Sequence, residues 1–304
     1  MKILFIGYGS IAQKHKVVLD GIYYQKKPKY YALRSSNESK TYDDIINIYN
    51  YNDIPENINF FIISNPTSYH NNAILSLVKY KKPIFIEKPV FHNLDHSEKI
   101  LSLIKKNNIK TYVACNLRFH KCIKYLKKII ENNYYGDVHE IISYSGSYLP
   151  DWRDLNYKEC YSSKSDLGGG VHLDLIHEID YLYWIFGSPN KIKKTLRSSS
   201  NLNIDSIDYA NYIFVYDNFV ININLNYFRK NPKRFVEIVF EKTSIYVDIL
   251  NHKIYENNIL IKGFNKKNID YTYKDQMKYF LDNINNSKIF NDIKEGVEVL
   301  KLAL

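Results

Sequence analysis

The chain has 304 residues, 45% of them hydrophobic and 24% charged, with a formal net charge of +10. This length is sufficient for two domains, and the composition is typical of a globular protein. It shows no apolar run near the roughly 18 residues of a membrane span, no secretory leader and no dense basic tract, so we expect a cytoplasmic protein without membrane or nucleic-acid partners.

The first half of the sequence alternates expected strands with expected helices. The strands are predicted at residues 2–6, 30–33, 60–64, 84–86 and 111–114. The helices are predicted at about 10–19, 40–48, 70–80 and 95–107. This alternation indicates an α/β domain whose parallel sheet is doubly wound, as in Rossmann folds.

The pattern changes after about residue 119. A helix is expected near 120–133, a strand at 138–147, and an irregular loop over 148–154. One further helix should follow residue 167 and end before Gly187. Alternating stretches at 209–216, 219–227, 236–241 and 244–248 then indicate antiparallel strands. We therefore predict a Rossmann domain at 1–118 and an α+β domain with an open, largely antiparallel sheet at 119–304.

A glycine motif directly follows the first strand. It reads Gly7-x-Gly9-x-x-Ala12 and opens the first helix. Gly7 allows a tight turn, Gly9 lets a pyrophosphate approach the backbone at the positive helix end, and Ala12 lets the helix lie close to the sheet. Small residues also pack turns for structural reasons alone, but this position between strand and helix predicts dinucleotide binding.

The end of the second strand bears on which nicotinamide cofactor is bound. NAD sites usually place Asp or Glu there for the ribose 2′-hydroxyl, whereas this chain has Arg34, Ser35 and Ser36. A guanidinium and hydroxyls suit a 2′-phosphate, so the sequence favours NADP over NAD. The alternative is an arginine solvated in a loop.

Two more segments carry a family resemblance. Asn65-Pro66-Thr67-Ser68-Tyr69-His70 follows the third strand, and Glu87-Lys88-Pro89 follows the fourth. With the glycine motif they resemble the glucose–fructose oxidoreductase/inositol dehydrogenase (Gfo/Idh/MocA) family. The resemblance continues through residues 116–119, through residues 167–180 and into the closing helices at 275–280 and 293–304.

The resemblance implies an NAD(P)-dependent enzyme that moves a hydride between nicotinamide and a sugar or sugar-derivative alcohol or ketone. Lys88 would lie between the nicotinamide and the reacting carbon, and His177 would be the general acid/base, supported by Asp174. An imidazole suits this proton transfer because its pKa is near neutrality. The family more often places the aspartate four positions before the histidine, and here the interval is three. Asp174 could instead serve the helix dipole, and His172 is a competing base.

Further site residues follow from the motifs and the resemblance. The cofactor-binding set is Gly7, Gly9, Ser10, Ile11, Arg34, Ser35, Ser64, Asn65, Pro66, His70, Glu87, Lys88 and Asn116. The substrate-binding set is Lys88, Arg118, Trp152, Arg153, Tyr161, Asp174 and His177. Trp152 could equally anchor a domain interface. A nucleotide-linked or amino sugar is the first expectation for the substrate.

Other features leave fewer expectations. The three cysteines, Cys115, Cys122 and Cys160, lack paired spacing, so we expect reduced thiols and no metal site. By resemblance, the protein should form a homodimer or homotetramer. The alternatives to a dehydrogenase are a cofactor-retaining glycoside hydrolase or isomerase, and a non-catalytic nucleotide-binding sensor or scaffold.

Overall fold

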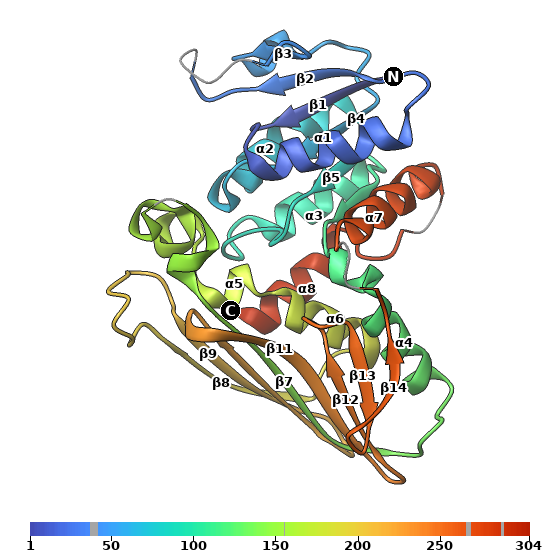
Figure 1. The fold of residues 1–304 in the computed structure, drawn as a ribbon. Helices are drawn as coiled ribbons and strands as arrows, with labels where there is room; N and C mark the ends of the chain where they lie inside the picture. The colour runs from blue at the N-terminus through green and yellow to red at the C-terminus, as the bar shows by residue number, and fades with distance from the viewer. Residues whose placement is uncertain (37–41, 155, 266–268, 287–288) are drawn as a thin grey trace. The chain divides into compact units, whose positions relative to one another are not determined.

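The chain folds into two compact units. The computed structural model describes residues 1–36, 42–154, 156–265, 269–286 and 289–304. The first unit comprises Met1–Cys115 and Asp270–Lys301, and the second comprises Asn116–Ile269 and Leu302–Leu304 (Figure 1). This division differs from the predicted boundary because residues 270–301 return to the first unit, where α7 (Asp270–Asn283) packs on α1 (Ser10–Ile22).

The first unit is built on a six-stranded sheet with the strand order β3-β2-β1-β4-β5-β6. Every pair in it is parallel, which confirms the predicted doubly wound sheet. The strands are β1 (Lys2–Ile6), β2 (Lys29–Leu33), β3 (Ile45–Ile48), β4 (Phe60–Ile63), β5 (Ile84–Ile86) and β6 (Thr111–Val113).

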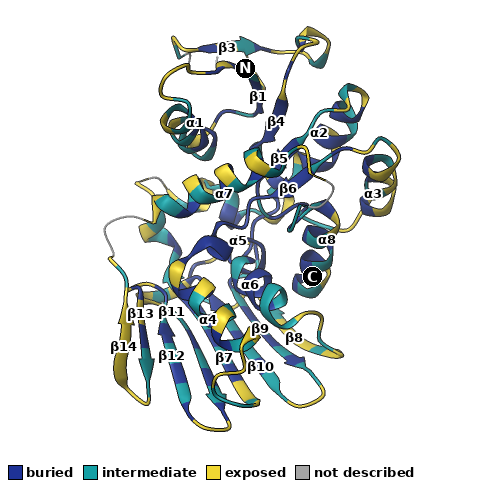
Figure 2. Ribbon diagram, turned by 90° about the vertical axis from the view of Figure 1, so that its right-hand side faces the viewer, coloured by how far each residue is buried: buried dark blue, intermediate teal, exposed yellow. Residues whose placement is uncertain are grey.

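Helices cover both faces of this sheet. Helices α1 and α7 lie on one side, and α2 (His70–Leu77) and α3 (Ser97–Lys106) lie on the other (Figure 2). The central strands are therefore apolar on both faces, and Leu4, Ile62 and Phe85 are completely buried. Each such side chain contributes about 1.5–3 kcal/mol on burial. The last helix, α8 (Ile293–Ala303), closes the chain.

One predicted helix is wrong. Residues 40–48 were expected to be helical, but Ile45–Ile48 form β3 at the edge of the sheet; residues 40 and 41 lie outside the described residues. The backbone of β3 pairs in parallel with β2, from Tyr30 opposite Ile45 to Leu33 opposite Ile48. Tertiary pairing with a neighbouring strand thus decides the conformation of this short apolar run.

The second unit is built on an eight-stranded sheet with the order β14-β13-β12-β11-β7-β10-β9-β8. Only β7 and β10 pair in parallel among these strands, which confirms a largely antiparallel sheet. The strands are β7 (Val138–Tyr148), β8 (Lys191–Arg197), β9 (Tyr209–Val215), β10 (Val220–Asn226), β11 (Phe228–Phe240), β12 (Ser244–Asp248), β13 (Lys253–Glu256) and β14 (Ile259–Gly263).

Helices α4 (Lys121–Glu131), α5 (Val171–Asp174) and α6 (His177–Phe186) lie over one face of this sheet (Figure 2). The hydroxyl of Ser143 on β7 lies 3.0 Å from that of Tyr181 on α6, so Ser143 faces the helices. Because side chains alternate along a strand, the neighbouring Tyr144 faces the opposite way. Tyr144 stacks on Phe235, and Phe235 on Tyr246, at ring-centroid separations of 5.7 and 5.1 Å. We call these three rings the aromatic row.

No helix within the described parts of the chain has both the length and the apolar character that crossing a bilayer would require.

Candidate functional site

The turn between β1 and α1 is shaped by two glycines. Gly7 has a φ of +78°, and a Cβ atom added to it would lie 2.9 Å from Cα of Asn65. Gly9 precedes α1, and a Cβ on Gly9 would meet no atom within 4 Å. Ser10, the first helical residue, is exposed, and Ile11 is half-buried. No side chain caps this helix end, so its first N–H groups can receive an anion.

The predicted residues after β4 lie beside this turn. The hydroxyl of Ser64 donates to the carbonyl of Gly7 at 3.1 Å, because β1 and β4 are neighbours in the sheet. The chain runs from β1 outward to β2 and β3 on one side, and from β4 to β5 and β6 on the other. Ligands of open α/β sheets bind at such a switch point, outside the carboxyl ends of the strands.

His70, predicted to bind the cofactor, is buried. Its ring nitrogens lie 3.0 Å from the carbonyl of Val90 and 3.1 Å from that of Asn65. Burial lowers the pKa of His70 below its usual value. The ring therefore connects the Asn65–Pro66 turn to the segment after Lys88. Pro66 itself is exposed.

Arg34 and Ser35 follow β2 as predicted. The guanidinium of Arg34 lies 3.5 Å from Oδ1 of Asn47 and 5.8 Å from the ring centroid of Tyr8, and Ser35 is exposed. The side chain of Arg34 is only half-buried, so a phosphate could reach it.

Glu87 and Lys88 follow β5. The carboxylate of Glu87 contacts Nε2 of His15 on α1, and its Oε2 accepts the backbone N–H of Lys88 at 3.3 Å. Lys88 is half-buried, and the peptide bond between Lys88 and Pro89 is cis. Lys88 thus lies beyond the carboxyl ends of the strands, as Gly7 and Asn65 do, because β1, β4 and β5 are parallel.

In the second unit, Arg118, predicted to contact the substrate, is buried and paired with Asp180. It is 1% exposed, and its guanidinium donates to both carboxylate oxygens of Asp180 at 2.9 and 2.7 Å. It also lies 5.6 Å from the ring of Trp184. The ion pair fastens the segment Asn116–Phe119 to α6. Asn116 is buried in the same turn.

The expected single helix around His177 is broken. Helix α5 ends at Asp174, Leu175 leaves helical geometry with a ψ of 27°, and α6 begins at His177. Asp174 is 4% exposed. Its two oxygens accept hydrogen bonds from the hydroxyls of Tyr161 and Tyr227 at 2.7 and 2.5 Å.

These contacts fix the protonation of both phenols. Burial, followed by the charge of Asp174, raises the pKa of Tyr161 and of Tyr227 well above the ordinary value of 10.0. Both tyrosines therefore remain hydrogen-bond donors to Asp174. The competing base His172 is also buried, and burial lowers its pKa to about 4. His177, in contrast, is half-buried at the first position of α6.

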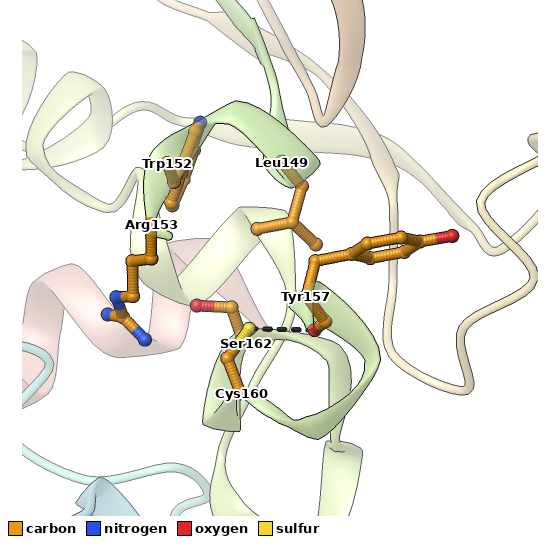
Figure 3. Close-up of a pocket in the computed structure, with 6 residues that line it drawn as sticks. All are labelled: Leu149, Trp152, Arg153, Tyr157, Cys160 and Ser162. Carbon is orange, nitrogen blue, oxygen red and sulfur yellow. Dashed lines mark hydrogen bonds between the residues drawn. The ribbon is translucent and has the colours of Figure 1, made fainter. Parts of the chain in front are cut away.

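The predicted aromatic residues gather around Asp174. The ring of Trp152 meets that of Tyr227 edge-on at 5.2 Å, and its indole N–H donates to Ser147 at 2.9 Å. The guanidinium of Arg153 lies 5.1 Å from the ring of Tyr161. A small hollow beside them, drawn in Figure 3, is lined by Leu149, Trp152, Arg153, Tyr157, Cys160 and Ser162.

That hollow is too small for a sugar. Its volume is about 10 Å³, room for roughly one water molecule. A second, open hollow of about 530 Å³ is lined by Tyr148, Ser199, Ser200, Asn201, Leu202, Phe228 and Lys230. The second unit therefore offers a large recess that the sequence did not indicate.

Sequence reasoning also missed His15 and Tyr227. His15 was detectable as buried, because it shares a helical face with Ala12 and Leu19 at intervals of three and four residues. Tyr227 has no such signal, since it directly follows β10, an ordinary alternating strand.

Comparisons with known proteins agree with both units. Residues 1–115 match the oxidoreductase family with an NAD-binding Rossmann fold, and residues 123–246 match the GFO/IDH/MocA C-terminal domain. Among curated relatives, myo-inositol 2-dehydrogenase of Thermotoga maritima is 28% identical over 132 residues, 43% of this chain and 37% of that protein. The chain thus spans little more than a third of that relative.

Two further similarities cover more of the chain. Glucose-6-phosphate 3-dehydrogenase of Bacillus subtilis is 25% identical over 268 residues, which is 83% of this chain and 72% of that protein. The solved structure of levoglucosan dehydrogenase in complex with NADH and levoglucosan superposes with a TM-score of 0.84. It covers 100% of this chain and 95% of its own, at 15% identity, which shows the shared fold.

The glycine turn yields a first prediction. Replacing Gly9 by Ala should weaken NADH binding at least about ten-fold, because a methyl group would occupy the space through which a pyrophosphate approaches the backbone. The free energy of unfolding should change little, since nothing in the described chain lies within 4 Å of that methyl group. Fluorescence titration with NADH and urea unfolding measure the two quantities.

Gly21→Ala is the matched control on the same helix, also with open space around it. It should leave NADH affinity unchanged. Equal NADH affinity in the Gly9→Ala variant and the wild type would contradict the assignment.

Proposed function

This chain belongs to the Gfo/Idh/MocA oxidoreductase family, and on that premise we propose that it is an NAD(P)-dependent dehydrogenase or reductase of a sugar or sugar derivative. The observation that carries the proposal is the glycine turn at the switch point of a parallel sheet, with Lys88 at the end of β5 on the same edge. The open space at Gly9 and the uncapped start of α1 fit a dinucleotide pyrophosphate.

In the proposed reaction a C–H bond of the substrate gives up a hydride while its hydroxyl gives up a proton. The bound nicotinamide supplies the hydride acceptor. The ammonium of Lys88 holds the substrate oxygen and favours the negative charge that develops on it. The imidazole of His177 receives the hydroxyl proton, and reduction of a ketone runs the same transfers in reverse.

Asp174 has a positioning role in this scheme. Its carboxylate is held by two phenols that stay protonated, so it is a fixed negative charge three residues before His177. A fixed carboxylate of this kind favours the charged form of an imidazole close to it. Trp152 and Arg153 contact the rings of the two tyrosines that hold this carboxylate, and with Tyr161 they are the proposed contacts to the substrate.

The substrate class is proposed as a nucleotide-linked or otherwise phosphate-bearing sugar. The named relatives act on sugars and inositol, one of them a sugar phosphate. The open hollow of the second unit has the size of a ligand site, and its lining combines Lys230 with the rings of Tyr148 and Phe228. A lysine can bind phosphate, and aromatic rings stack on sugar or base faces.

The central test starts with the purified protein, both oxidised and both reduced nicotinamides, and a panel of nucleotide sugars, sugar phosphates, inositols and free aldoses. On the substrate found, Lys88→Ala and His177→Ala should each lower kcat by about 10²–10⁴-fold, because each removes a group that acts on the transferring proton or the developing charge. The Kd for NADH should change by less than about three-fold.

Lys105→Ala, on the exposed side of α3, is the control and should be fully active. Product formed without accumulation of the other nicotinamide redox form would indicate a cofactor-retaining hydrolase or isomerase. Cofactor binding with no turnover on any compound would indicate a sensor. Either result would overturn the dehydrogenase proposal.

We further propose NADP as the preferred cofactor, through Arg34. The Arg34→Ala variant should bind NADPH about ten-fold more weakly and NADH unchanged, because a charge-assisted hydrogen bond to the 2′-phosphate is lost. Calorimetric titration with both cofactors measures this. Arg197→Ala, on β8 of the second unit, should change neither affinity. Tighter binding of NADH than of NADPH by the wild type would refute the preference.

Self-association through the aromatic row is the last proposal, as a homodimer or homotetramer. The row lies on the sheet face opposite α6, and half-exposed rings of this kind favour burial in an interface. Sedimentation velocity should give a dimer or tetramer for the wild type. The Phe235→Asp variant should shift it toward monomer. A monomeric wild type at micromolar concentration would exclude the proposal.

A further inference from the structure

The first unit contains a buried acid–base pair that the scheme above does not use. Nε2 of His15 on α1 contacts Oε1 of Glu87, directly after β5. The side chain of His15 is completely buried, and that of Glu87 is 12% exposed. A buried carboxylate is costly unless it is paired, so this contact decides where Glu87 can point.

The surroundings of the His15 ring favour one tautomer. Nδ1 of His15 is buried and has no hydrogen-bond partner among the described residues. A buried N–H without an acceptor costs about 1–3 kcal/mol, whereas a neutral ring can place its proton on the other nitrogen. The geometry therefore favours the tautomer in which Nε2–H donates to an ionised Glu87.

The second oxygen of Glu87 connects this pair to the lysine. Oε2 accepts the backbone N–H of Lys88 at 3.3 Å. Two residues further along, the carbonyl of Val90 is held by the ring of His70. The segment from Lys88 to Val90 is thus fixed at both ends by a buried histidine, one on α1 and one on α2.

Helix α7 shields the pair from water. The ring of His15 lies 6.1 Å from that of Tyr273 on α7 and 5.0 Å edge-on from Phe85 on β5. Lys14, next to His15, pairs with Asp270 at 2.9 Å and lies 3.9 Å over the ring of Tyr273. Removing His15 would leave the carboxylate of Glu87 without its buried partner. The next residue in sequence, Lys88, carries a positive charge that this carboxylate could then attract.

We propose that His15 is a positioning residue for Lys88: its Nε2–H holds the Glu87 carboxylate against the backbone N–H of Lys88, which fixes the place from which the lysine side chain starts. The contact between His15 and Glu87 does not depend on the proposed function. Only the catalytic role of Lys88 rests on that function. His15 therefore acts through Glu87 and touches neither cofactor nor substrate.

The first test needs no variant and no substrate. ¹⁵N NMR of the wild type, labelled in histidine, should show His15 as the Nε2–H tautomer at neutral pH. A signal of the Nδ1–H tautomer, or of two rapidly exchanging tautomers, would overturn the proposal.

The second test compares His15→Phe, which keeps an aromatic ring but has no donor, with His15→Gln, which keeps an N–H donor. Reductive methylation by formaldehyde and a borane, followed by mass spectrometry, reports the reactivity of each lysine amine. In His15→Phe the released carboxylate should pair with Lys88 and slow its methylation about three-fold or more, because an opposite charge favours the protonated amine. His15→Gln should restore the wild-type rate.

Controls separate positioning from folding. The rate at Lys105 normalises the reagent, and Ile100→Val, buried on α3 of the same unit, loses core packing without reaching the pair. Ile100→Val should leave methylation of Lys88 unchanged. A wild-type rate at Lys88 in a folded His15→Phe variant, or equal slowing in His15→Gln, would refute the role.

A kinetic measurement joins the proposal to catalysis once a substrate is known. His15→Phe should lower kcat about ten-fold or more, with the Kd for NADH within about two-fold and kcat rescued in His15→Gln. If no substrate is turned over, the proposed function fails, while the NMR and labelling results still decide whether His15 positions Lys88.

Discussion

The close approach of Gly7 to Asn65 is the constraint on which the candidate site depends. Two neighbouring parallel strands end here with their backbones so near that a single added carbon would lie 2.9 Å from the opposite chain. Gly7 satisfies this with a left-handed φ that other residues adopt at a cost. The turn leaves the start of α1 open, and the same sheet edge then presents the end of β5 with Lys88.

The residues around the candidate site share a second property, because each is held in place by a hydrogen bond or ion pair from a neighbouring side chain. Asp174 is held by the phenols of Tyr161 and Tyr227, and the backbone of Lys88 by a carboxylate that is itself held by His15. Arg118 is committed to Asp180 and so fixes the segment that enters the second unit. Rigid surroundings of this kind reduce the reorganisation needed when charge develops during a reaction.

Much of the fold could be predicted from the sequence, because the buried parallel strands are continuous apolar runs and the glycine motif lies between a strand and a helix. The edge strand β3 could not, since four residues do not distinguish strand from helix and pairing with β2 decides the outcome. The break between α5 and α6 and the return of α7 to the first unit also depend on tertiary packing. At the site, the motif residues are predictable because they follow one another along the chain in a known order. The contacts of Tyr227 with Asp174 and of His15 with Glu87 join positions far apart in sequence, which the sequence alone does not reveal.

The path of the chain has a consequence for how the two units can be separated. Residues 270–301 belong to the first unit although the whole second sheet lies before them in sequence, so the first unit is assembled from both ends of the polypeptide. A fragment that stops at residue 115 lacks α7, and the face of α1 that carries Lys14 and His15 would then meet solvent. Apart from Leu302–Leu304, the second unit is accordingly an insertion in the first. Recombination between two relatives at a single crossover point would therefore always give a protein in which at least one unit combines segments from both parents.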